Sequence, residues 1–209
     1  MVDAETDTRE VYAILLAAGA SRRYGGKNKL LEEIDGTPLV RRVAERLLGS
    51  RAAGVIVVTG FEAERVAEAL CGLDIDIVRN RDHDAGLSSS LRCGIAAIPE
   101  EAAGAMIVLA DMPDITPAFV NRLLDAFAQE GGARIVYPVR ADGAQGNPVV
   151  WPVRYFAELQ SLSGDAGAKR LIARHEDATL RVPAAGDAPL RDIDTPGDLD
   201  AWRAGGKNR

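Results

Sequence analysis

A glycine-rich, basic loop directly follows the first apolar run of the chain, which ends near Leu16. The loop holds three glycines, two arginines and two lysines: Gly19, Gly25, Gly26, Arg22, Arg23, Lys27 and Lys29. Glycine lets backbone N–H groups approach a ligand closely, and nearby cations add charge, so this composition suits a polyphosphate. The spacing matches neither the P-loop nor the dinucleotide-binding motif. A solvated, basic turn is the alternative that spacing alone leaves open.

Asp111 directly follows the apolar run 106–110. In open α/β sheets, ligands bind beyond the carboxyl ends of the strands, so a carboxylate at this position is expected to face the site. The alternative is that Asp111 only caps the next turn, as Asp often does. We favour the functional interpretation because Asp114 and Thr116 are available for local capping.

Asp192 and Asp194 stand two positions apart, just before a predicted helix. In an extended segment both would point the same way, with Ile193 turned towards the core. A second carboxylate beside Asp111 could complete a magnesium site of oxygen ligands, in which phosphate and water supply the rest. Taken alone, Asp-Thr-Pro is also an ordinary helix start with Thr195 as the N-cap.

Two further segments carry weaker signals. Segment 86–92, Gly-Leu-Ser-Ser-Ser-Leu-Arg, offers hydroxyls and free N–H groups at a helix N-terminus, which could hold an anion or hydrogen-bond a base or ribose. Simple serine capping is its alternative. Asn147 has an amide that both donates and accepts, although a plain turn residue would look the same. We expect His83 to be solvated and Cys93 to be a small buried residue.

Strand-like and helical segments alternate, which is the pattern of a mostly parallel sheet covered by helices. Strands are predicted at 11–16, 55–59, 75–78, 105–110, 135–139, 148–151 and 178–182. Helices are predicted over 62–70 and 154–162. Five further helices are predicted from their cap residues: one after Thr37 and Pro38, one from serines 88–90 to residue 98, one from Thr116 to residue 129, one from Asp165 to residue 175, and one after Thr195. This arrangement places the basic loop and Asp111 after two different strands.

Length and composition favour one soluble domain, with two small domains as the alternative; we place the single domain at 10–205, after a polar tail at 1–9. The chain has 209 residues, 47% of them apolar, and a mean hydropathy of −0.05. A net charge of −6 argues against a nucleic-acid surface, and no apolar run approaches the roughly 20 residues of a membrane span. The acidic start is unlike a secretory signal. Two separated cysteines, Cys71 and Cys93, fit a reducing cytoplasm, and two histidines leave little material for zinc.

The basic loop and five further segments resemble, in the same order, the motifs of a known family. These segments are 86–92, 109–113 (Leu-Ala-Asp-Met-Pro), 146–148 (Gly-Asn-Pro), 164–168 (Gly-Asp-Ala-Gly-Ala) and 192–196 (Asp-Ile-Asp-Thr-Pro). The family is that of the molybdenum cofactor cytidylyltransferases and guanylyltransferases, within the MobA-like NTP transferase superfamily. Each motif is weak alone, but six in order are fairly specific to the superfamily, and they cover nearly the whole chain.

The resemblance implies an α/β, Rossmann-like three-layer fold in a single domain, with a mostly parallel sheet and one reversed strand. It implies that Arg23 and Lys29 hold a nucleoside triphosphate and act with Asp111 in catalysis, and that Asp111 and Asp194 bind Mg²⁺. The nucleotide-binding residues so implied are Leu16, Ala17, Ala18, Gly19, Ser21, Arg23, Lys29, Ser88 and Asp111. Asn147 falls on the acceptor side.

Three positions qualify the resemblance. Ala18 looks like the cytidylyl branch, since guanylyl members usually carry a second glycine there. Tyr24 replaces the family's usual Met, which we expect to change packing rather than chemistry. Asn147 stands where cytidylyl members often have His, a departure that falls on the acceptor side.

The leading hypothesis is Mg²⁺-dependent transfer of CMP from CTP to a phosphorylated acceptor, molybdopterin, with release of pyrophosphate. The alternatives are a related transferase with another NTP or a sugar phosphate, an NAD(P)-type oxidoreductase on the same fold, and a non-catalytic maturation factor that binds a nucleotide. We expect a cytoplasmic protein that hands its product to a molybdoenzyme and binds neither nucleic acid nor membrane. Against the oxidoreductase, the first loop lacks Gly-x-Gly-x-x-Gly.

Overall fold

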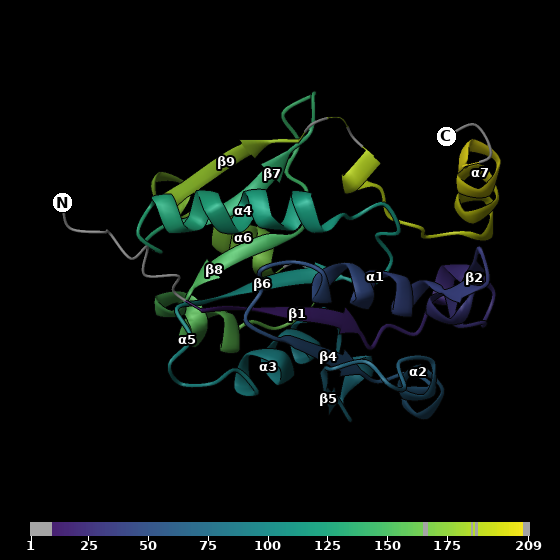
Figure 1. The fold of residues 1–209 in the computed structure, drawn as a ribbon. Helices are drawn as coiled ribbons and strands as arrows, with labels where there is room; N and C mark the ends of the chain where they lie inside the picture. Colours follow the sequence, from purple (N-terminus) through teal and green to yellow (C-terminus); the bar gives the residue numbers. More distant parts are fainter. Residues whose placement is uncertain (1–9, 165–166, 185, 187, 207–209) are drawn as a thin grey trace.

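The computed structural model describes residues 10–164, 167–184, 186 and 188–206. Two expectations lie outside these residues, the polar tail at 1–9 and the helix cap at Asp165. A seven-stranded sheet runs through the molecule in the order β5-β4-β1-β6-β8-β7-β9 (Figure 1). Its strands are β1 (Val11–Ala17), β4 (Val55–Thr59), β5 (Asp76–Arg79), β6 (Gly104–Leu109), β7 (Ile135–Val139), β8 (Val149–Pro152) and β9 (Thr179–Pro183).

One strand is reversed. Strand β8 runs antiparallel to both of its neighbours, β6 and β7, whereas β1 pairs in parallel with β4 and β6, and β7 pairs in parallel with β9. The predicted α/β fold with a mostly parallel sheet and one reversed strand is therefore confirmed. Strand order changes direction around β1, so the crevice beyond β1 and β6 is where such a sheet binds ligands.

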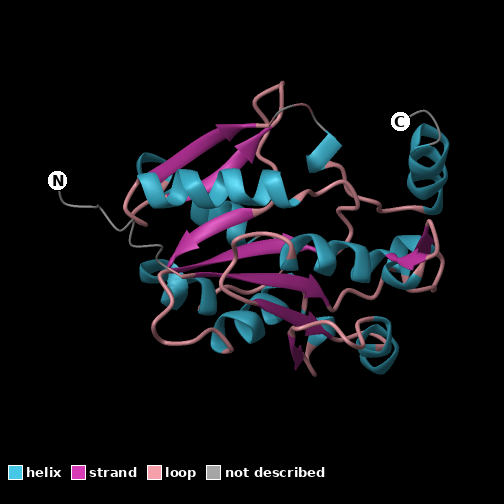
Figure 2. Ribbon diagram, in the orientation of Figure 1, coloured by secondary structure: helices cyan, strands magenta, loops and turns pink. Residues whose placement is uncertain are grey.

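Helices cover both faces of the sheet, giving three layers (Figure 2). The helices are α1 (Leu39–Leu48), α2 (Ala63–Ala69), α3 (Leu87–Ala96), α4 (Pro117–Gln129), α5 (Phe156–Gln160), α6 (Gly167–Arg174) and α7 (Pro196–Gly206). Alternate residues of β1 enter different cores, as a strand period of two requires. Ala13 and Leu15 pack with α1, α2, α4 and α7, while Ile14 and Leu16 pack with α3, α5 and α6. No helix among the described residues is long and apolar enough to span a membrane.

Helices follow at both places where we predicted a Thr or Ser cap, but the caps differ: Pro38 is the N-cap of α1, with no side-chain cap hydrogen bond, and Gly86 is that of α3. Thr37 and Pro38 form a short strand, β3 (Thr37–Pro38), which pairs with β2 (Glu33–Ile34) across a tight turn. Asp35 and Gly36 both adopt positive φ there, which is the conformation that a two-residue hairpin needs. Serines 88–90 do not cap a helix from outside, because α3 begins one residue earlier and Gly86 is its N-cap. Thr116 does cap α4, its hydroxyl accepting a hydrogen bond from the Phe119 N–H.

Gly94 lets helix α3 pack directly on the sheet. A Cβ atom at this position would lie 2.5 Å from Ile14 Cγ2 and 3.1 Å from Val58 Cγ2. Gly94→Ala should therefore lower the free energy of unfolding by about 1–3 kcal/mol, measured by urea denaturation. Gly197→Ala, on α7, is the control, since its nearest neighbour would be 3.7 Å away. Equal stability of the two variants would contradict this account of the packing.

Candidate functional site

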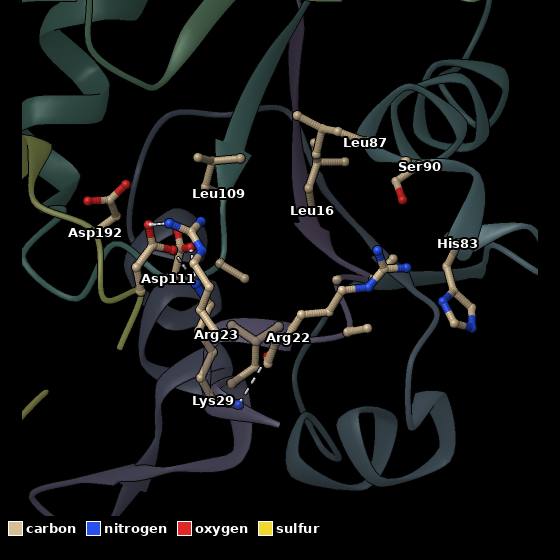
Figure 3. Close-up of a pocket in the computed structure, with 18 of the residues that line it drawn as sticks. Leu16, Arg22, Arg23, Lys29, His83, Leu87, Ser90, Leu109, Asp111 and Asp192 are labelled. Atoms are coloured by element: carbon tan, nitrogen blue, oxygen red, sulfur yellow. Dashed lines mark hydrogen bonds and ion pairs between the residues drawn. The ribbon is translucent and has the colours of Figure 1, made fainter. Parts of the chain in front are cut away.

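A pocket of about 530 Å³ opens beyond the carboxyl ends of β1 and β6. Eight of the residues predicted from the sequence line it: Leu16, Ala18, Gly19, Ser21, Arg23, Lys29, Asp111 and Asp194. Ala17, Ser88 and Asn147 are not among its lining residues. Figure 3 shows Arg23 and Lys29 extending towards the side of the pocket where Asp111 lies, with Leu87, Ser90 and His83 on the other side.

The basic loop is held by short helical turns and buried anchors. Tyr24, in the 3₁₀ turn Arg22–Tyr24, and Leu30, in the turn Lys29–Leu31, are both buried in the core beneath the loop. The Ser21 hydroxyl accepts a hydrogen bond from the Lys29 N–H, and the Asn28 carboxamide oxygen accepts one from the Leu30 N–H. Tyr24 and Leu30 thus anchor the loop in the core, while the side chains of Arg22, Arg23 and Lys27 are exposed. Burial of Tyr24 agrees with a packing role for this position.

Lys29 bridges two carboxylates that lie far away in the sequence. Its Nζ lies 2.7 Å from Asp111 Oδ2 and 3.0 Å from Asp194 Oδ1, while Arg23 Nη1 lies 2.9 Å from Asp194 Oδ2. We call these four residues the ion cluster. The Ile193 N–H donates to the Asp111 carbonyl at 2.9 Å and thereby fixes the two acidic segments side by side. Ile193 is buried, as the alternation predicts.

The carboxylate of Asp198 holds the Asp194 segment in place. It accepts hydrogen bonds from the N–H groups of Asp194 and Thr195 and from the Thr195 hydroxyl. The Thr195 hydroxyl in turn accepts from the Asp198 N–H, so Thr195 is the predicted cap of α7. These bonds lower the pKa of Asp198. The interpretation of Asp-Thr-Pro as a helix cap is therefore compatible with the functional one, since the hydrogen bonds of the cap also orient Asp194.

Burial and neighbouring charges shift the pKa values of two residues of the ion cluster, Asp111 and Lys29. Burial raises the pKa of Asp111, and the negative charges of Asp192 and Asp194 raise it further, while Lys29 opposes this shift only in part. Burial alone would lower the pKa of Lys29, but Asp111 and Asp194 outweigh it and raise that pKa. The Lys29 ammonium group is therefore charged at neutral pH.

The donor set of the ion cluster fits a hard divalent cation. Carboxylate oxygens are the protein ligands that Mg²⁺ prefers. Asp111 Oδ1 is buried and has no hydrogen-bond partner among the described residues, so it offers a free ligand atom. No group of three or more His, Cys, Asp or Glu side chains suited to a metal occurs in the described parts of the chain. Further ligands would have to come from water or phosphate.

The opposite side of the pocket is formed by the loop after β5 and the start of α3. Ser90 lines the pocket there and accepts a hydrogen bond from the carboxamide of the buried Asn80. His83, which we expect to be solvated rather than catalytic, is partly exposed, at 22% of its side chain, and lines the pocket. Ser88 and Asn147 lie elsewhere, Ser88 buried within α3 and Asn147 just before β8.

Sequence reasoning missed Asn80. It stands directly at the carboxyl end of β5, the kind of position that marked out Asp111. Its partners Ser89 and Ser90 follow only nine and ten residues later. A polar residue at a predicted strand end, followed at short range by a run of serines, was the available signal.

A doubly wound sheet with a cationic loop and two carboxylates at its carboxyl edge is an arrangement whose chemistry suits a phosphorylated ligand beside a divalent metal. The chain belongs to the family described as the MobA-like NTP transferase domain, whose model matches residues 13–179. The family resemblance seen in the sequence is therefore confirmed, and the chain is a member of the nucleotidyltransferase superfamily.

Two curated relatives carry different names. Nicotine blue oxidoreductase of Paenarthrobacter nicotinovorans is 28% identical over 202 residues, which is 91% of this chain and 95% of that protein. A probable molybdenum cofactor guanylyltransferase of Natronomonas pharaonis is 33% identical over 112 residues, which is 54% of each chain.

Two solved mycobacterial structures share the fold. The homologue of Mycobacterium tuberculosis Rv0371c from Mycobacterium sp. strain JC1 is 32% identical, has a TM-score of 0.83, and aligns over 96% of this chain and 98% of its own. Rv0371c from M. tuberculosis H37Rv in complex with manganese is 27% identical, with a TM-score of 0.76 over 93% of this chain and 98% of its own.

Proposed function

We propose that this protein is a Mg²⁺-dependent nucleotidyltransferase that moves CMP from CTP to the phosphate of molybdopterin and releases pyrophosphate. The observation that carries the proposal is the ion cluster, in which the cations Arg23 and Lys29 meet the carboxylates of Asp111 and Asp194 at the carboxyl edge of the sheet. The manganese complex of Rv0371c supports a divalent ion in this fold. The relative named as a molybdenum cofactor guanylyltransferase supports the acceptor.

The proposed transfer is an in-line displacement at the α-phosphorus. An oxygen of the acceptor phosphate forms the new P–O bond, while the bond to the oxygen that bridges to the β-phosphate breaks and pyrophosphate leaves with that oxygen. A phosphate monoester has a second pKa of about 6, so the acceptor is largely dianionic at neutral pH and needs no general base. The site therefore has to align charged groups rather than remove a proton.

Each member of the ion cluster has a role in this scheme. Lys29 and Arg23 would move from the carboxylates to the triphosphate oxygens, which offer both cations a stronger partner. Bound at Asp111 and Asp194, Mg²⁺ would supply neutralisation of the charge that develops on the leaving group. The base and ribose would extend to the side of the pocket that holds Ser90. Ala18, in place of a second glycine, favours CTP, and Asn147 would contact the acceptor.

A panel of ligands tests this proposal. We expect the correct nucleoside triphosphate, at 100 times its Kd with Mg²⁺, to stabilise the protein by about 2.7 kcal/mol, or roughly 5–10 °C in Tm. The panel holds CTP, GTP, ATP and UTP, and the ligand that binds is then incubated with molybdopterin while pyrophosphate is followed. Binding without pyrophosphate release would contradict catalysis and favour a nucleotide-binding maturation factor.

A second candidate function is an NAD(P)H-dependent oxidoreductase. It is favoured by the similarity to nicotine blue oxidoreductase over 95% of that protein's length. NADPH and NADH therefore belong in the same panel. Stabilisation by NADPH, with no stabilisation by any triphosphate, would contradict the transferase proposal and favour this second function. We also propose a cytoplasmic setting, because Cys71 and Cys93 are free thiols. If molybdopterin is the acceptor, a molybdoenzyme would receive the product.

A further inference from the structure

Asn80 is a buried polar residue at the end of β5, only 5% exposed, and it belongs to no part of the ion cluster. Its backbone N–H donates to the Thr59 carbonyl at 2.8 Å, which fixes it beside the end of β4. Its carboxamide nitrogen donates to Ser89 Oγ at 2.8 Å and to Ser90 Oγ at 3.0 Å, while its carboxamide oxygen accepts from the Asp82 N–H at 3.0 Å. All the polar atoms of this side chain are therefore used.

The orientation of the Asn80 carboxamide is determined by its partners. The Asp82 backbone N–H can only donate, so the carboxamide oxygen must face it. The opposite orientation would place an NH₂ group against an N–H and leave both without an acceptor. The NH₂ group consequently faces the two serines, and each hydroxyl must use a lone pair to accept from it.

The two serines then differ in where their own protons go. The Ser89 hydroxyl donates to the Gly86 carbonyl at 2.8 Å. The Ser90 hydroxyl donates to no residue that the structure describes, and Ser90 is the one of the pair that lines the pocket. Both are equally buried, at 4% exposure. The Ser90 hydroxyl proton thus has no acceptor among the described residues, and a ligand in the pocket could supply one.

We propose that Asn80 is a positioning residue for nucleoside recognition, which fixes the Ser90 hydroxyl as a hydrogen-bond donor towards an acceptor atom of the base or ribose. The proposal rests on the proposed function, since it assumes that a nucleotide enters this pocket. Asn80 does not touch the ligand but acts through Ser90. The pocket thereby prefers a nucleoside that presents a carbonyl oxygen, ring nitrogen or ribose oxygen at this position over one that presents an N–H.

Asn80→Asp is the informative substitution because it preserves shape and reverses polarity. A carboxylate keeps the bond from the Asp82 N–H but has no N–H of its own, so its second oxygen would accept the hydroxyl protons of Ser89 and Ser90. The Ser90 lone pairs would then face the pocket. We expect the Kd of CTP with Mg²⁺, measured by calorimetry without acceptor, to rise about tenfold or more.

A probe without a nucleoside separates this effect from a general loss of binding. Inorganic tripolyphosphate with Mg²⁺ reports only on the ion cluster, so Asn80→Asp should leave its Kd within about twofold of wild type. Ser90→Ala should weaken CTP about fivefold, whereas Ser89→Ala, the matched control, should leave CTP binding unchanged. In a Ser90→Ala background, Asn80→Asp should cost less than about twofold more.

Three results would overturn the role of Asn80. These are an unaltered Kd of CTP in Ser90→Ala, an equal loss of CTP and tripolyphosphate in Asn80→Asp, and a full Asn80→Asp effect that persists without the Ser90 hydroxyl. If Asn80→Asp fails to fold, Asn80→Ala replaces it, with an expected loss of about threefold that disappears in the Ser90→Ala background. Wild-type protein that binds neither CTP, another triphosphate nor tripolyphosphate would instead refute the proposed function itself.

Discussion

Replacing Asp111 with asparagine should lower the kcat of nucleotidyl transfer by about 100-fold or more. The asparagine keeps an oxygen that can accept from Lys29, but it loses the negative charge that a divalent cation needs. Asp111 also carries the one buried carboxylate oxygen of the ion cluster that has no partner among the described residues. The loss should therefore appear in the chemical step and in the Mg²⁺ concentration required for half-maximal rate.

The matched control for this prediction is Asp125→Asn. Asp125 is an exposed carboxylate on α4 that pairs with Arg51 and does not line the pocket. It should retain wild-type pyrophosphate release with CTP and molybdopterin. A circular dichroism melt of both variants separates misfolding from loss of chemistry. Undiminished pyrophosphate release by a folded Asp111→Asn protein would remove Asp111 from the catalytic machinery.

Apolar runs bounded by turn residues made the fold predictable. The runs at 55–59 and 105–110 contain enough β-branched residues to be buried strands, and the structure places β4 and β6 there within one residue. The helix predicted after Thr37 and Pro38 begins at Leu39, but the prediction missed that these two residues first form a hairpin strand, with which cap-plus-proline is also compatible. The preceding Asp-Gly turn decided the outcome, since its positive φ values direct the chain back to pair with β2.

The location of the candidate site could be predicted because the carboxyl ends of parallel strands meet at one edge of a sheet. That rule brings the loop after β1 and the residue after β6 together, although Lys29 and Asp111 are 82 positions apart. It says nothing of which cation meets which carboxylate, because that depends on side-chain reach and on the bond from the Ile193 N–H to the Asp111 carbonyl. The Asn80 hydrogen bonds were hidden for the same reason, as they depend on how α3 packs over β5.

The second large effect is expected at Lys29. Its ammonium group lies between Asp111 Oδ2 and Asp194 Oδ1, the same carboxylates that we assign to the metal. In the nucleotide-free protein, Lys29 and a divalent cation must therefore compete for them. When a triphosphate binds, it gives Lys29 another anionic partner and frees the carboxylates. Nucleotide and metal should accordingly bind with positive coupling, each raising the affinity for the other.

Lys29→Met should show separately how Lys29 affects metal binding and how it affects nucleotidyl transfer. Removal of the ammonium leaves two nearby carboxylates without their shared partner, so Mn²⁺ binding to the nucleotide-free variant, measured by electron paramagnetic resonance, should tighten about tenfold. Pyrophosphate release should fall about 100-fold because one electrostatic stabiliser of the triphosphate is lost. Lys27→Met, an exposed lysine on the same loop, should change neither quantity. Mn²⁺ affinity that stays constant or weakens in Lys29→Met would show that the ammonium does not compete with the ion, and the carboxylates would then bind metal in a different arrangement.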